Sequence, residues 1–123
     1  MSMNHQRADA IEYNGELCTI KRKAVSVSSS GDNSVISGVT GKKLVVISGH
    51  LVSAGTVAVT LKSGTGGGAV SLSGAMPLVA NGQIQMQYSP VGHFETAAGS
   101  ALNISLGGAV AVTGLLTYIE VSV

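Results

Sequence analysis

The chain has 123 residues, a formal charge of +1 and 45% hydrophobic residues. Its length suits one domain, and so small a net charge excludes a global field that would draw the chain onto nucleic acid or an anionic membrane. The single cysteine, Cys18, excludes an intramolecular disulfide and a cysteine-based zinc cluster and indicates synthesis in a reducing cytosol.

Residues 1–20 are predicted to form an extended N-terminal arm, separate from one domain over residues 21–123. The arm is rich in charge, lacks a sustained alternation of apolar residues and contains the turn-like NGE at 14–16. Its residue order does not match a signal peptide, and no apolar run in the chain approaches the roughly twenty residues of a membrane helix. The arm is either a frayed terminus or a segment that orders on a neighbouring subunit or a host surface. Its last residues could also extend the first strand of the domain.

The basic residues in and beside this arm are the candidate partner-binding residues. Arg7 lies in the arm, and Lys21, Arg22 and Lys23 follow it. The tyrosines are not interleaved with these residues as stacking platforms for bases would be, so nucleic acid is not the expected partner. We expect attachment to an acidic protein surface, and we expect truncation of residues 1–16 to weaken attachment while leaving thermal stability nearly unchanged.

From Ala24 onward the sequence predicts an all-β fold. Apolar and polar residues alternate with a period of two; Val57, Val59 and Leu61, for example, are expected on one face of a strand. About seven or eight such segments, spaced roughly ten residues apart with no helical segments between them, fit an antiparallel β-sandwich of jelly-roll type. The segments are AVSVSSS, SVISGV, KKLVVISGHLVSA, TVAVTLKSG, GAVSLSG, QIQMQYS, ALNISLGG and AVAVTGLLTYIEVSV. Pro77 and Pro90 are expected in connections or at strand edges.

Two glycine-containing sequences fail as cofactor sites. KSGTGGGAV has the glycine spacing of a dinucleotide fingerprint, but another strand segment follows it instead of a helix, and no acidic residue lies between Asp32 and Glu95. GVTGKKL lacks the leading glycine spacing of a phosphate loop and the Ser or Thr after its lysine. We expect turns at both places and no cofactor.

The sequence PVGHFETAAG at 90–99 is the stretch in which a catalytic or metal site would be sought. His93 and Glu95 would project to the same side of an extended chain, which is one requirement of a metal site or an acid–base pair. A zinc site needs at least three protein ligands, and the only other histidines are His5 and His50. The sequence therefore predicts no metal site, no catalytic residue and no enzymatic activity.

The favoured interpretation of the same stretch is a structural loop. Pro90 and Gly92 would shape a turn, Phe94 would fill one end of the sandwich, and Glu95 with Thr96 would bond nearby backbone amides.

The domain itself carries few charges. Six charged residues stand among residues 24–123, whereas about a quarter of the residues of a typical soluble domain are charged. So uncharged a surface is typical of an assembly subunit, and we expect a homo-oligomer, with a trimer favoured over a dimer.

The motifs of the second half fit together into a family pattern. Gly92, Phe94 and the ETAAG of 95–99 are followed by the ALN of 101–103 and by GLLTYIEV at 114–121. In this order, over roughly residues 43–121, the chain resembles small structural proteins of tailed bacteriophages. His93 stands where a bulky apolar residue is usual in that group.

The resemblance implies a non-enzymatic virion component with a jelly-roll-like fold. The function that follows is a capsid decoration or cement protein, made in the host bacterial cytoplasm, which binds the major capsid protein on the capsid exterior. The alternative is a receptor- or glycan-binding module of a head fibre or tail.

Overall fold

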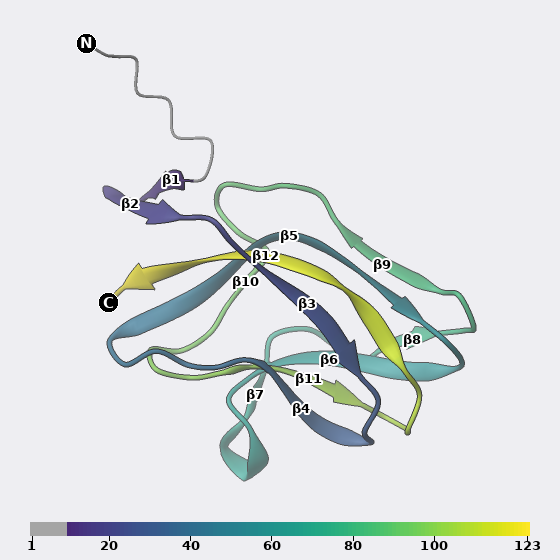
Figure 1. Ribbon diagram of the computed structural model, residues 1–123. Coiled ribbons are helices and arrows are strands. Elements are labelled where there is room, and N and C mark those ends of the chain that lie inside the picture. The colour runs from purple at the N-terminus through teal and green to yellow at the C-terminus, as the bar shows by residue number, and fades with distance from the viewer. Residues whose placement is uncertain (1–9) are drawn as a thin grey trace.

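A computed structural model describes residues 10–123, which form strands, connecting loops and one short 3-10 turn, Gly66–Gly68 (Figure 1). The strands are β1 (Ala10–Tyr13), β2 (Glu16–Thr19), β3 (Lys21–Val27), β4 (Gly31–Ile36), β5 (Lys42–Ser53), β6 (Val57–Ser63), β7 (Val70–Ser71), β8 (Met76–Leu78), β9 (Gln83–Met86), β10 (Phe94–Glu95), β11 (Leu102–Leu106) and β12 (Val112–Ser122). Within this described range, no helix is long and apolar enough to cross a membrane.

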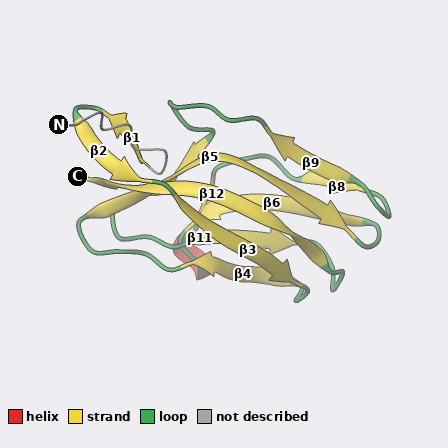
Figure 2. Ribbon diagram, turned by 45° about the horizontal axis from the view of Figure 1, so that its top comes forward, coloured by secondary structure: helices red, strands yellow, loops and turns green. Residues whose placement is uncertain are grey.

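Two antiparallel sheets form the body of the molecule and lie in separate layers (Figure 2). The β5 sheet has the order β3–β12–β5, and β9 and β10 both pair with the far side of β5. The β6 sheet has the order β4–β11–β6, and β7 and β8 both pair with the far side of β6. The prediction of an all-β, antiparallel structure is confirmed. Pro77 lies in β8, an edge strand, where a missing N–H is tolerated.

The pairing between strands is nested along the chain. Within the body, the first strand pairs with the last and the second with the next to last, as β3 with β12 and β4 with β11. The inner strands then pair as β5 with β9 and β10, and β6 with β7 and β8. Most consecutive strands therefore lie in opposite sheets, and the contacts that hold the fold together join residues far apart in sequence.

The main core lies between the two sheets and follows the predicted alternation. Val57, Val59 and Leu61 of β6 are buried, as are Leu102 and Ile104 of β11. They pack against inward-facing residues of the β5 sheet, which include Leu44, Val46, Leu51, Val112 and Leu116. Burial of these aliphatic side chains is the dominant favourable contribution to folding.

A second, smaller core lies on the outer face of the β5 sheet, under a hairpin formed by β1 and β2. Val45 and Ile47 of β5 and Ile119 and Val121 of β12 are buried there together with Cys18 of β2. Ile11, Tyr13 and Ile20 pack around this cluster. The outer face of the sheet is therefore dry at this end, although an outer face normally meets water.

A β-bulge in β5 shapes this second core. Thr117 pairs with Ser48 and Tyr118 pairs with Val46, which leaves Ile47 as the extra residue of β5. The hairpin is further held by the Glu16 carboxylate, which accepts hydrogen bonds from the Ser122 backbone N–H at 2.9 Å and from the Ser122 hydroxyl at 3.0 Å.

The prediction of an extended arm over residues 1–20 is therefore not confirmed where the structure describes the chain. Residues 10–19 form a hairpin that buries apolar surface, because Ile11, Tyr13 and Cys18 supply an apolar side too sparse to stand out as a strand pattern. Residues 1–9 lie outside the described residues. The expectation that truncation of residues 1–16 leaves stability unchanged is revised, since that truncation removes β1 from the second core.

The first prediction concerns this second core. Ile47→Ala should lower the free energy of unfolding by about 3 kcal/mol, because the Ile47 side chain is 0% exposed although it lies on the outer face of the β5 sheet. Val52→Ala is the matched control on the same strand: Val52 is half-buried beyond the hairpin, so its loss should be about 1 kcal/mol or less. Urea unfolding followed by tyrosine fluorescence measures both. Equal losses for the two variants would contradict the docked hairpin.

Candidate functional site

The predicted structural loop, residues 90–99, lies along β5 and contains β10. The His93 N–H donates to the Val46 carbonyl at 2.7 Å, and the Thr96 N–H donates to the Leu44 carbonyl at 2.9 Å. Thr96 is buried, and its hydroxyl oxygen accepts a hydrogen bond from the Leu44 N–H at 2.9 Å. These bonds fix the loop to the central part of the β5 sheet.

Pro90 and Gly92 lie in the turn at the start of this loop. The Gly92 N–H donates to the Ser89 carbonyl at 3.0 Å, which places Pro90 at the second position of a four-residue turn, where its fixed φ is favourable. Gly92 has a φ of +85°, and a Cβ on this residue would collide with the Val45 side chain. Glycine is required here for both reasons.

The three residues after the turn make separate contacts. Phe94 is half-buried and packs against the main core. The His93 imidazole Nε2 bonds the Gln87 carbonyl oxygen. The Glu95 carboxylate lies 3.1 Å from the Lys43 ammonium and accepts a hydrogen bond from the Tyr13 hydroxyl at 3.3 Å. Glu95 therefore bonds side chains rather than the backbone amides predicted for it, and only Thr96 bonds an amide.

These contacts do not make His93 and Glu95 a reactive pair. The histidine is engaged with a carbonyl on its own loop, whereas the glutamate joins the loop to β5 and to the β1–β2 hairpin. Over residues 10–123 no group of three or more His, Cys, Asp or Glu side chains is placed to hold a metal ion.

Three of the basic residues predicted to bind a partner are the first three residues of β3. Lys21, Arg22 and Lys23 are all exposed, and the Lys21 ammonium lies 3.2 Å from the Glu120 carboxylate. Strand geometry places Lys21 and Lys23 on the inward side of β3 with Val25, and Arg22 on the opposite side. Arg7 lies outside the described residues.

These basic residues stand beside a hollow between the two sheets. The hollow has a volume of about 250 Å³ and is lined by Lys23, Ala24, Ser26 and Val27 of β3 and by Ser34 and Val35 of β4. Among the described residues, β3 pairs only with β12 and β4 only with β11. This side of the sandwich therefore has two open strand edges with a hollow between them.

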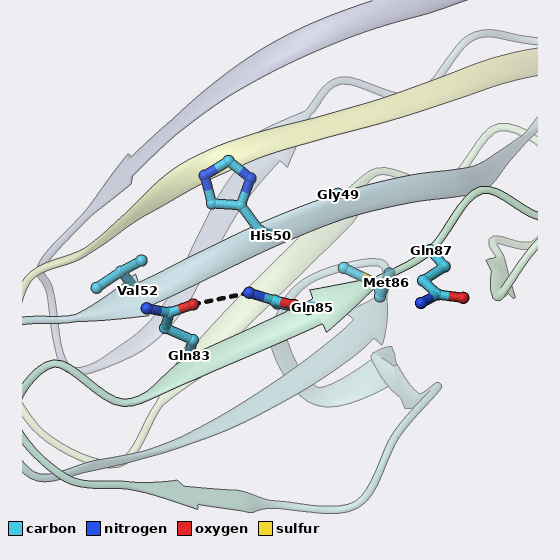
Figure 3. Close-up of a pocket in the computed structure, with 7 residues that line it drawn as sticks. All are labelled: Gly49, His50, Val52, Gln83, Gln85, Met86 and Gln87. Atoms are coloured by element: carbon cyan, nitrogen blue, oxygen red, sulfur yellow. Dashed lines mark hydrogen bonds between the residues drawn. The ribbon is translucent and has the colours of Figure 1, made fainter.

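A second polar hollow, which the sequence analysis did not single out, lies over the β5–β9 pairing (Figure 3). The Gln85 amide donates to the Gln83 side-chain oxygen at 2.8 Å, and His50 pairs across the strands with Gln85. The hollow has a volume of about 480 Å³, and its lining residues are Gly49, His50, Val52, Gln83, Gln85, Met86 and Gln87. The alternating glutamines of QIQMQ at 83–87 are the sequence signal that could have indicated it.

This lining supplies hydrogen-bonding groups and contains no acidic residue, lysine or arginine. Three amide side chains and one imidazole can donate to and accept from hydroxyl groups, and no lining residue is a carboxylate or a thiol. The arrangement suits a neutral polar molecule rather than an ion.

Backbone groups of the glycine-rich turn after β6 form hydrogen bonds with side chains of this chain. The Gly66 N–H donates to the Asp32 carboxylate at 2.7 Å, and the Asn103 side-chain amide donates to the Gly64 carbonyl at 3.0 Å. Asn103 is fully buried, although its place in the alternation of β11 predicts an exposed side chain. The single 3-10 turn is followed by β7, so the sequence forms a turn between strands, as predicted, and not a phosphate-binding helix start.

No protein-family model matches this chain, and neither the curated proteins nor the solved structures include a significant match to it.

The second prediction tests the turn at Gly92. Gly92→Ala should lower the free energy of unfolding by about 2 kcal/mol or more, because the new Cβ meets Val45 and the backbone is left-handed. Gly74→Ala is the control, since a Cβ there has nothing within 4 Å and no left-handed φ, and its effect should stay within about 1 kcal/mol. Thermal and urea unfolding of both variants measure the difference, and a neutral Gly92→Ala would refute the described turn.

The third prediction concerns pH. A side-chain hydrogen bond with Asn103 and the Gly66 amide hold the pKa of Asp32 below its ordinary value of 3.8. A lowered folded-state pKa stabilises the fold above the unfolded pKa, and this contribution disappears as pH falls through the lower folded value. Asp32→Asn should therefore be less stable than the parent chain at neutral pH, and the gap should close from about pH 4 downward. Urea titrations of both chains at neutral pH and below about pH 4 measure the difference in their free energies of unfolding. A difference that is the same at both pH values would contradict this role.

Proposed function

We propose that this chain is a non-enzymatic structural protein of a tailed-bacteriophage virion. In this proposal it is a capsid decoration, or cement, protein that binds the outer surface of the major capsid protein and stabilises the head. It would be made in the host bacterial cytoplasm and would end on the capsid exterior.

The observation that carries the proposal is the nested strand order. Pairing of β3 with β12, β4 with β11, β5 with β9 and β10, and β6 with β7 and β8 gives four strand positions in each sheet. This order supports assignment as a jelly roll, a double-sheet fold found in viral capsid proteins and lectins. Because one fold hosts many functions, the proposal depends equally on the resemblance of residues 43–121 to phage structural proteins.

The charge distribution supports an assembly role. Beyond the hairpin, the two central strands of the β5 sheet carry His50, Val52, Thr113 and Leu115 on their outer face, and none of these is an acidic residue, a lysine or an arginine. Interfaces between proteins are depleted of charged residues at their centres. We propose a homo-oligomer, with a trimer favoured, in which such surface is covered.

The loop at 90–99 has a structural role in this proposal. Its polar residues hold the hairpin and the sheet together through Glu95, Lys43 and Tyr13, and the Lys43 ammonium also lies 5.7 Å from the centre of the Tyr13 ring. Because the second core and the hydrogen bonds between Glu16 and Ser122 also hold the hairpin, replacement of both His93 and Glu95 by alanine would leave attachment to particles largely intact.

The second candidate function is a receptor- or glycan-binding module of a head fibre or tail. The hollow with Gln83, Gln85 and His50 favours it, because amide and imidazole groups bond sugar hydroxyls. Loss of glycan binding in Gln83→Ala, with binding retained in Val70→Ala, an exposed position on β7 of the other sheet, would support this second function.

The fourth prediction separates the two functions. In purified phage particles that contain this chain, we expect it in a fixed ratio to the major capsid protein and distributed over the head surface. A fibre or tail module would instead occur in few copies at one position. Quantitative mass spectrometry and cryo-electron microscopy of intact particles measure both quantities. Heads that lack the chain should also break at a lower temperature, and adding purified chain back should restore their resistance; density confined to the tail would overturn the decoration role.

A further inference from the structure

We propose that the free edge of β3 receives an extended, acidic segment of a partner protein as an additional strand of the β5 sheet. This inference deepens the proposed function, because it names the chemistry by which the chain would attach to another protein. It rests on the backbone of β3, on the basic residues of that strand and on the hollow beside it.

The backbone of β3 offers hydrogen-bonding groups at alternate residues. The Ala54 N–H donates to the carbonyl of Ala111, the residue before β12, so the backbone groups of Ala111 point toward β5. The backbone groups of Ser53 instead bond Gly82 and Asn81, on the side of β5 away from β12. The backbone N–H and C=O groups of successive residues point to alternate edges of a strand. Those of Thr113 and Leu115 in β12 therefore point toward β5. Those of Val112, Gly114, Leu116 and Tyr118 point toward β3.

The register then fixes which groups of β3 are free. Val27, Val25, Lys23 and Lys21 pair with those four residues of β12, without a bulge. The N–H and C=O groups of Arg22, Ala24 and Ser26 therefore point away from the sheet, where no described strand pairs with them. Such a row of groups is a template for strand addition.

The side chains of β3 favour an acidic segment. Among the described residues, neither Arg22 nor Lys23 forms an ion pair, and the two lie on opposite sides of the strand. An added strand with acidic residues at neighbouring positions would meet one basic residue on each face. A second copy of β3 fits less well, since the strand KRKAVSV has three basic residues and no acidic one, so two such edges repel each other.

The hollow beside the edge accommodates the inward side chains of an added strand. Val27 and Val35 give it an apolar part, and Lys23 lies at its boundary. Strands of one sheet lie about 4.8 Å apart, and two packed sheets lie about 10 Å apart. An additional strand along β3 would therefore extend the β5 sheet over this hollow and cover apolar surface there.

The experiment measures binding of a synthetic peptide to the purified full chain. The peptide has about nine residues, enough to span β3, with two neighbouring glutamates at its centre, threonine and valine elsewhere and both ends blocked; a second peptide has lysine in place of both glutamates. Backbone amide NMR signals report the site, and the titration gives the affinity at low and at raised salt. Because no particle is present, this test can fail while particle decoration holds, and the reverse is equally true.

Two pairs of variants make the test specific. Ser26→Pro removes an outward N–H without touching the bonds to β12, and Ser26→Thr keeps that N–H. Lys23→Glu reverses a charge at the edge, and Lys62→Glu makes the same change on the β6 sheet. If Ser26→Pro does not fold, the charge pair still tests the edge.

We expect the acidic peptide to shift the amide signals of Arg22, Ala24 and Ser26 and to bind more weakly at higher salt. Ser26→Pro should weaken binding roughly fivefold, the effect of about one hydrogen bond, and Lys23→Glu should weaken it more, whereas the two controls should bind like the parent chain. No binding, equal binding of the lysine peptide, or signal changes centred elsewhere would overturn the proposal. Self-association through β3 that Ser26→Pro abolishes would also overturn it, because the occupant of the edge would then be a second copy.

Discussion

The pairing of β5 with β12 is the interaction on which the rest of the structure depends. The two strands pair along their length, from Val112 and Ser53 to Ser122 and Lys42. Every other strand of the β5 sheet is attached to one of them. At one end they are buried on both faces, by the main core inside and by the β1–β2 hairpin outside. Burial on both faces excludes water from their ladder, so this end is the part of the sheet least able to tolerate a polar substitution.

The sequence contains a signal for this burial on both faces, but the signal does not identify the segment that covers the outer face. Residues Leu44–Ile47 form a continuous apolar run inside a strand that otherwise alternates, and such a run is typical of a strand covered on both sides. The run says that something covers the outer face, but it does not say which segment. The hairpin that covers it contributes only a few apolar side chains between charged ones, so its own pattern indicates an arm.

Sequence patterns predicted the strands and the main core because a period of two directly reports which side chains face inward. They did not predict partners between strands, since pairing joins distant segments such as Asp32 and Gly66 or Asn33 and Asn103. Asn103 illustrates the limit: alternation places it outside, but the glycine-rich turn and β4 bury it and satisfy its amide. The glutamine hollow and the open β3 edge depend on the same long-range pairing and were missed for the same reason.

A connection of one residue joins the β1–β2 hairpin to the edge strand β3, because only Ile20 separates Thr19 from Lys21. Ile20 packs against the second core, and Lys21 is tied to Glu120 of β12. The docked hairpin therefore fixes the direction in which β3 enters the sheet. An edge that is already paired with β12 on one side and anchored at its first residue loses little conformational entropy when a further strand pairs with it. On this argument the hairpin acts on attachment indirectly, by preorganising the neighbouring edge, and the partner need not contact the hairpin itself.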